Sequence, residues 1–312
     1  MSLPKHAEIL KVIDTLAARY LQGKIRAIRM AMVSLLSGGH LLLEDIPGLG
    51  KTTLALALSG VLGLRFGRIQ CTSDLLPSDI TGLSIFNREE NSFKFIRGPI
   101  FNNIVLVDEI NRSMPRTQSA LLEAMEERRV TVEGNTYQLP DPFLVIATQN
   151  PLEQVGTYPL PESQLDRFLI CTGVGYPPEA IEKAIIRGGS IRDEIMGLEP
   201  LISLEDVLEA KRSVQKVFIS EKIVDGIFAL VAASRDNPHV LSGISTRGAI
   251  SIAEAAKSMA FLEGRDFVAP EDVAAVAVPV GAHRLILARE HEGLNKGDVL
   301  ASVIKNTPMP LA

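Results

Sequence analysis

The chain has 312 residues, a formal net charge of −5 and two cysteines, and its length predicts about two domains of roughly 150 residues each. Cys71 and Cys171 form no CxxC pair, which excludes a disulfide framework and a cysteine-based zinc site, and the negative charge provides no overall basic field for nucleic acid or an anionic membrane. No apolar run reaches the ~18–20 residues that cross a bilayer, and the charged stretch MSLPKHAEILKVID lacks the apolar segment of a signal peptide, so we expect a cytoplasmic protein without direct membrane insertion.

Short apolar runs alternate with helical stretches through the first ~175 residues. Near-continuous apolar strands separated by helices are typical of a parallel sheet that is covered on both faces, with ligands at the carboxyl ends of the strands. The sequence therefore predicts an α/β fold with a five-stranded parallel sheet. The expected strands are His40–Glu44, Arg65–Cys71, Asn103–Asp108, Phe143–Thr148 and Phe168–Val174.

Two segments, Leu83–Gly98 and Arg128–Asp141, alternate apolar and polar residues around polar turns and predict inserted β-hairpins. After Tyr176 the strand signals stop and helical patterns follow, including a long one over Ala269–His291. We expect an α/β core over residues 1–176 and a smaller, all-helical lid domain over residues 177–312, with Pro177-Pro178 at the boundary.

The stretch EDIPGLGKTT joins the first strand to a helix, which is the context of a P-loop. Gly48 and Gly50 let backbone N–H groups face phosphate oxygens, Lys51 would reach the β- and γ-phosphates, and the Thr52 hydroxyl would bind Mg²⁺. Asp45 stands where the first glycine of the motif is usual, so the first turn of the loop is expected to differ. We expect the phosphates to be held by Pro47, Gly48, Leu49, Gly50, Lys51, Thr52 and Thr53.

The third predicted strand, NIVLVDE, ends in adjacent carboxylates, which is the Walker B pattern. Asp108 would hold Mg²⁺ together with Thr52, and Glu109 would orient and polarise the attacking water. With the P-loop, this pair predicts an enzyme that hydrolyses ATP with Mg²⁺ as cofactor.

Three further polar residues follow in suitable places. Asn150 ends the fourth strand and can reach the γ-phosphate or the water; Arg167 precedes the last strand; Arg247 begins a helix in the second part of the chain. Two plainer interpretations stay open: Arg167 could pair with Asp166 on the surface, and Arg247 could face solvent.

Together these features resemble an AAA+ ATPase, and several stretches are very close to the signature of the MoxR family. They are GGHLLLEDIPGLGKT, DLLPSDITG, GPIFNNIVLVDEINR, QSALLEAMEE and ATQNPLEQVGTYPLPESQLDRF. The inserted hairpins also resemble the clade that includes magnesium chelatase.

The resemblance implies that Asn150 acts as sensor 1, that Arg247 acts as sensor 2 and reaches the γ-phosphate from the lid, and that Arg167 is an arginine finger acting on ATP held by the neighbouring subunit. It implies nucleotide between the two domains at a subunit boundary and a homo-oligomeric ring, expected to be a hexamer. It further implies chaperone-like work on a client protein, with von Willebrand factor A domain proteins as the expected partners.

Three other functions remain as alternatives. A magnesium-chelatase-like subunit would use the same ATPase frame to drive metal insertion. A nucleic-acid motor would want basic or aromatic hairpin tips, whereas NREENS and EGNT are acidic or neutral, so no nucleic-acid partner is expected. A nucleotide-gated scaffold without turnover would not need Glu109 or Arg167.

Overall fold

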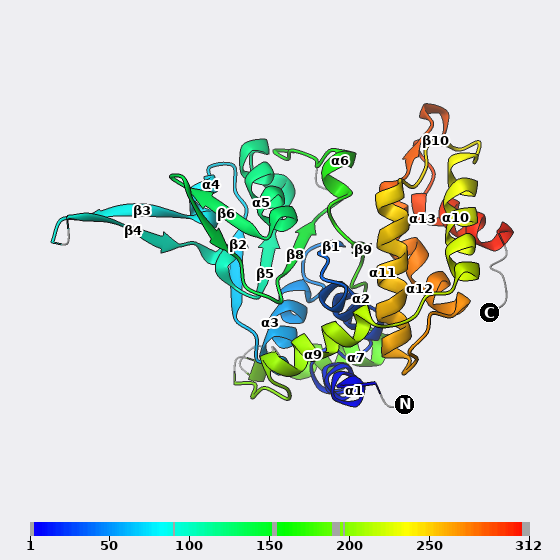
Figure 1. Ribbon diagram of the computed structural model, residues 1–312, viewed down its shortest axis with the longest axis horizontal. Helices are drawn as coiled ribbons and strands as arrows, with labels where there is room; N and C mark the ends of the chain where they lie inside the picture. Colours follow the sequence, from blue (N-terminus) through cyan, green and yellow to red (C-terminus); the bar gives the residue numbers. More distant parts are fainter. Residues whose placement is uncertain (1–2, 90, 152–154, 189–193, 196, 308–312) are drawn as a thin grey trace.

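A computed structural model of the chain describes residues 3–89, 91–151, 155–188, 194–195 and 197–307. At its centre lies a five-stranded sheet in the order β2-β5-β8-β1-β9, in which every neighbouring pair of strands is parallel (Figure 1). The predicted α/β class and sheet are therefore confirmed. The strands are β1 (Leu41–Glu44), β2 (Phe66–Gln70), β5 (Ile104–Asp108), β8 (Leu144–Gln149) and β9 (Ile170–Thr172).

Both faces of this sheet are covered, which explains the near-continuous apolar runs. Successive side chains of a strand point to opposite faces. In β1, Leu41 and Leu43 accordingly join one apolar cluster and Leu42 joins another. The first cluster includes residues of α1 (His6–Thr15), α2 (Ile25–Leu36) and α3 (Lys51–Val61), and the second includes residues of α5 (Pro115–Glu127).

The two predicted hairpins are present as antiparallel pairs, β3 (Gly82–Asn87) with β4 (Ser92–Arg97) and β6 (Arg129–Val132) with β7 (Asn135–Gln138). The first extends away from the body, at the left of Figure 1. Phe95 of β4 stacks on Tyr137 of β7 with ring centroids 4.2 Å apart, so the two hairpins support one another. Glu90 of the first hairpin and Leu152–Gln154 of the family signature lie outside the described residues.

The second part of the chain is predominantly helical, and its helices from residue 221 onward lie at the right of Figure 1, but the expectation of an all-helical lid needs one correction. A short antiparallel pair joins β10 (Val240–Ser242) and β11 (Ile286–Leu287). The expectation of a single helix over Ala269–His291 is also wrong, because α12 ends at Gly281 and a 3-10 turn over Ala282–Arg284 leads into β11. The helices are α7 (Glu179–Gly188), α9 (Leu204–Gln215), α10 (Glu221–Arg235), α11 (Thr246–Leu262), α12 (Pro270–Gly281) and α13 (Lys296–Asn306).

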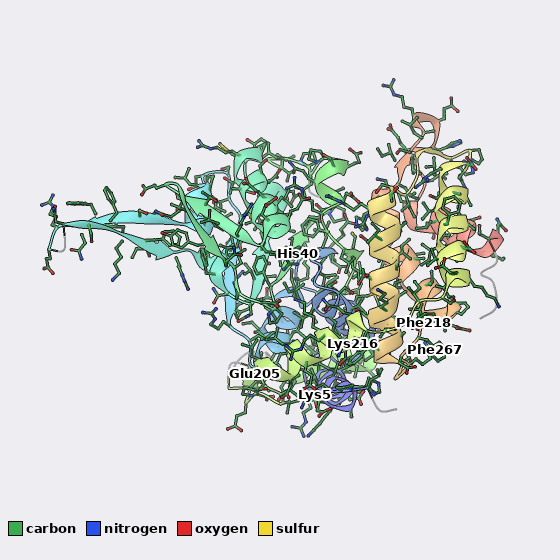
Figure 2. All side chains as sticks on the ribbon, in the orientation of Figure 1. Lys5, His40, Glu205, Lys216, Phe218 and Phe267 are labelled. Atoms are coloured by element: carbon green, nitrogen blue, oxygen red, sulfur yellow. The ribbon has the colours of Figure 1, made fainter. Side chains whose placement is uncertain are left out.

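The first apolar cluster continues from α1–α3 into α9, α11 and α12, so core and lid share packed interior. The division of the chain after Tyr176 stays a prediction. On the lid surface, Phe218 and Phe267 lie close together, joined by a backbone bridge (Figure 2). None of the helices in the described part of the chain has the length and apolarity to span a membrane.

Candidate nucleotide site

The segment predicted to hold phosphate forms a tight turn between β1 and α3. Gly48 and Gly50 have φ angles of 87° and 92°, a region that side chains with a Cβ rarely adopt. An added Cβ at Gly48 would meet no heavy atom within 4 Å, so its glycine is needed for backbone conformation and not for space. Helix α3 begins at Lys51 directly after the turn. The first N–H groups of the helix, which have no partner within it, therefore face the turn as an anion site requires.

Asp45, the departure from the usual motif, fastens this turn to the sheet. Its Oδ2 accepts hydrogen bonds from the backbone N–H groups of Val174 and Gly175, just beyond β9. Its own carbonyl oxygen accepts a hydrogen bond from Lys51 Nζ at 2.6 Å. A glycine at position 45 would make the loop more flexible, whereas the Asp45 carboxylate ties the loop to the segment after β9.

Lys51 lies close to several carboxylates. Its pKa is lowered, chiefly by desolvation, while the charges of Asp45, Asp108 and Glu109 oppose that shift. An ammonium group that has lost part of its water shell gains when a phosphate supplies new acceptors.

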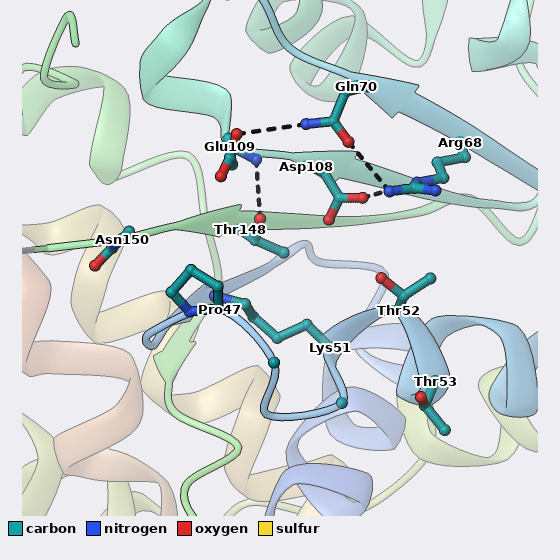
Figure 3. Close-up of a pocket in the computed structure, with 12 residues that line it drawn as sticks. Pro47, Lys51, Thr52, Thr53, Arg68, Gln70, Asp108, Glu109, Thr148 and Asn150 are labelled. Carbon is teal, nitrogen blue, oxygen red and sulfur yellow. Dashed lines mark hydrogen bonds and ion pairs between the residues drawn. The ribbon is translucent and has the colours of Figure 1, made fainter. Parts of the chain in front are cut away.

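The Walker B carboxylates follow β5, beside the P-loop strand. Glu109 has a left-handed φ of 56°, and its backbone N–H donates to Thr148 Oγ1 on β8 at 2.9 Å. Asp108 Oδ2 lies 2.8 Å from Arg68 Nε, and Glu109 Oε2 lies 3.4 Å from Gln70 Nε2. Arg68 and Gln70 both come from β2, so side chains of the neighbouring strand contact both acids (Figure 3).

These groups line one cavity of about 360 Å³ at the carboxyl ends of β5, β8 and β1 (Figure 3). It contains nine of the residues predicted from the sequence, but not Leu49, Arg167 or Arg247. It also contains three that sequence reasoning missed, namely Arg68, Gln70 and Thr148. The sequence does contain a signal for Arg68 and Gln70: they are polar residues at alternate positions of a predicted buried strand, so their side chains lie on the same face of the sheet. The predicted residues in the cavity are Pro47, Gly48, Gly50, Lys51, Thr52, Thr53, Asp108, Glu109 and Asn150.

Arg167 and Arg247 lie elsewhere. Arg167 precedes β9, at the amino-terminal edge of the sheet, whereas the P-loop follows the carboxyl end of β1. At about 3.3 Å per residue, the four residues of β1 put roughly 10 Å between the two edges. Arg247 joins Arg167 through a shared carboxylate, Glu126 of α5.

Two outcomes follow from these positions. Within one chain the cavity is lined by core residues and Arg247 is not among them, so the contact of Arg247 with the γ-phosphate stays a prediction. The alternative pairing of Arg167 with Asp166 is wrong, because Arg167 pairs with Glu126 and Asp166 is engaged by Arg284, whose Nε lies 2.7 Å from Oδ1.

The side chains suit Mg²⁺ in their chemistry. Thr52 and Asp108 offer the hydroxyl and carboxylate oxygens that Mg²⁺ prefers, and this ion is commonly held by one or two carboxylates with substrate phosphates and water. Within the described residues, no cluster of three or more His, Cys, Asp or Glu side chains could hold a metal ion without such help.

Comparison with known proteins places this geometry in a family. Residues 40–170 match the ATPase family associated with various cellular activities (AAA), and residues 232–303 match the AAA lid domain. A crystal structure from Cytophaga hutchinsonii, described as that of an ATPase, superposes with a TM-score of 0.89 at 39% identity, covering 98% of this chain and 96% of that one. The chain therefore has the AAA core and lid.

Relatives of known sequence narrow the class further. Chaperone MoxR1 of Mycobacterium tuberculosis is 40% identical over 86% of this chain and 73% of its own length. Protein MoxR of Paracoccus denitrificans is 32% identical over 93% of both chains, and YeaC of Bacillus subtilis is 45% identical over 94% of this chain and 92% of its own. The chain belongs to the MoxR family of AAA+ ATPases.

Proposed function

We propose that this protein is a Mg²⁺-dependent ATPase that works as a ring, in which each nucleotide is bound by one subunit and completed by Arg167 and Arg247 of the next. The ring would use the hydrolysis cycle to remodel or mature partner proteins. One observation carries the shared site: the two arginines meet at the edge of the sheet opposite the P-loop.

The P-loop and the two arginines lie at opposite edges of the sheet, which favours head-to-tail assembly of the subunits. A contact between the P-loop edge of one copy and the arginine edge of the next joins two different surfaces. Such head-to-tail interfaces close into rings when the rotation permits. The family resemblance sets the expected number of subunits at six.

Within this site each residue has a role that its position supports. Lys51 and the N–H groups at the start of α3 bind the phosphates, while Thr52 and Asp108 hold Mg²⁺, which would neutralise phosphate charge. Glu109 orients the attacking water and accepts its proton. Asn150 lines the same cavity (Figure 3), so it can contact this water or the γ-phosphate. An arginine supplied by a neighbour stabilises charge in the transition state and is worth ~10³–10⁵ in rate in GTPases.

Mixing two inactive variants tests the shared site. Arg167→Ala retains the P-loop but lacks an arginine, and Lys51→Ala lacks phosphate binding but retains both arginines. Mixed rings contain interfaces in which an intact P-loop meets intact arginines, so phosphate release should reappear. If both variants co-assemble, as judged by sedimentation or mass photometry with ATP, and the mixture stays inactive at every ratio, the shared site is refuted.

The client needs a separate experiment. Since the family relatives include a protein named as a chaperone, we propose a protein partner, and the resemblance favours one with a von Willebrand factor A domain. Glu109→Gln should trap the ATP-bound assembly for affinity capture, with Lys51→Ala as the matched control that cannot reach this state. Enrichment of such a domain by the first variant alone supports the maturation function, and enrichment of a chelatase subunit supports metal insertion instead.

A further inference from the structure

A single carboxylate connects the two arginines assigned to the neighbouring site. Glu126, near the carboxyl end of α5, accepts from Arg247 Nη2 at 2.7 Å through Oε1 and lies 3.3 Å from Arg167 Nε through Oε2. Its two oxygens thus join the lid helix α11 to the segment that leads into β9. Neither contact could be expected from local sequence, since Glu126 is 121 residues from Arg247.

The surroundings of Glu126 carry an excess of positive charge. A cavity of about 260 Å³ at this edge is lined by four arginines and two carboxylates. Asp166 is engaged by buried Arg284, and Arg128 donates to the carbonyl oxygens of Gly38 and Phe143. Glu126 is therefore the carboxylate placed to offset the repulsion between Arg167 and Arg247.

This contact contributes little to fold stability. The exposed fractions of the side chains are 38% for Glu126, 30% for Arg167 and 55% for Arg247, and ion pairs so accessible to water are typically worth about 0–1 kcal/mol. The consequence of the contact is geometric. It holds two guanidinium groups side by side, and because it uses Nε of one and a single terminal nitrogen of the other, both retain donors for a second acceptor.

We infer that Glu126 is a positioning residue, which presents Arg167 and Arg247 as a pair to the triphosphate of the neighbouring subunit. This inference rests on the proposed shared site. A phosphate group can accept from both guanidiniums at once, and holding them in place beforehand avoids the loss of side-chain freedom at the moment of reaction.

The test uses Glu126→Gln, which retains the size of the side chain and loses its charge. We expect the turnover rate of the assembled protein to fall at least tenfold, with less than a threefold change in nucleotide affinity measured on the same preparation. Glu127→Gln is the matched control, because Glu127 is the next residue of α5 and pairs with Arg129, away from the two arginines. It should retain turnover within twofold of the wild type.

Mixing separates positioning from a general structural defect. A Glu126→Gln subunit has an intact P-loop, which should hydrolyse ATP when it faces the intact arginines of a Lys51→Ala subunit. The mixture should therefore regain phosphate release. Normal turnover of Glu126→Gln alone, or failure of this mixture when Arg167→Ala with Lys51→Ala is rescued, overturns the role of Glu126. Failure of both mixtures refutes the shared site itself.

Discussion

Arg68 of β2 and Asp108 of β5 form an ion pair within the nucleotide cavity, with Nε and Oδ2 separated by 2.8 Å. The same carboxylate is the proposed Mg²⁺ ligand, so the guanidinium and the metal compete for its oxygens. Arg68 also adds a positive charge where phosphates would lie when no metal is present.

Arg68→Gln should therefore make nucleotide binding depend more strongly on Mg²⁺. Without Mg²⁺ the variant loses a positive charge near the phosphates, and with Mg²⁺ it frees Asp108, so both effects raise the ratio of the two dissociation constants. The Arg68 side chain is 44% exposed, which limits the expected change to roughly three- to tenfold. Calorimetric titration with ADP, with and without Mg²⁺, measures the ratio. Arg65→Gln, the same change before the other end of β2, should leave it unaltered.

Glu109 holds a backbone conformation that carries strain, and the hydrogen bond from its N–H to Thr148 fixes it beside Asp108. Glu109→Gln preserves that backbone contact and removes the proton acceptor. We expect nucleotide affinity to stay within a few-fold of the wild type and phosphate release to fall by roughly 10²–10⁴, the usual contribution of a general base. Equal losses of binding and turnover would contradict a catalytic role for this carboxylate.

The anchor at Asp45 leads to a different kind of prediction. Asp45→Gly restores the usual motif but removes the acceptor for Val174 and Gly175. Hydrogen bonds to charged groups contribute about 1.5–3 kcal/mol each, and the one from Gly175 is weak at 3.4 Å, so the free energy of unfolding should fall by about 1.5–3 kcal/mol. Urea denaturation measures this loss. Asp45→Asn retains one acceptor oxygen and should be less destabilised, and an unchanged unfolding free energy in the glycine variant would show that the contact is not structural.

The strands and the P-loop could be predicted because their signals are local. A buried parallel strand must be apolar over its length, and a turn with left-handed residues before a helix selects glycine. The end of α12 could not be predicted in this manner. The sequence allows a helix to continue past Gly281, but a 3-10 turn follows over Ala282–Arg284. Within it Arg284 donates to the carbonyl oxygen of Phe168 in the core, a contact that only the folded chain creates.

The positions of the arginines show the same limit. The sequence placed Arg167 before a strand and Arg247 at a helix start, and both placements agree with the structure. Which edge of the sheet the lid helix approaches depends on how the lid packs, and no local pattern records it. The role of Arg247 as a nucleotide sensor therefore follows from the family resemblance alone and stays a prediction.

Two buried histidines, His40 in the interior (Figure 2) and His283, predict how stability depends on pH. Desolvation, helped by the charges of Arg128 and Arg284 respectively, lowers the pKa of each to about 3. The folded chain keeps both rings neutral, whereas in the unfolded chain they take up protons below about pH 6.5. The free energy of unfolding should therefore be fully retained above pH 6.5 and fall as the pH drops from there toward 3.

At pH 5.5 each histidine should lower the free energy of unfolding by about 1.4 kcal/mol relative to pH 7.5. Gln can donate to the carbonyl oxygen of Met125 or Phe168 as the imidazoles do, without titrating. His40→Gln and His283→Gln should each be less stable at pH 7.5, yet each should lose about 1.4 kcal/mol less than the wild type between the two pH values, and the double variant about twice that. Urea denaturation at both pH values provides the comparison. Equal pH dependence in all four proteins would mean that neither ring is held neutral by the fold.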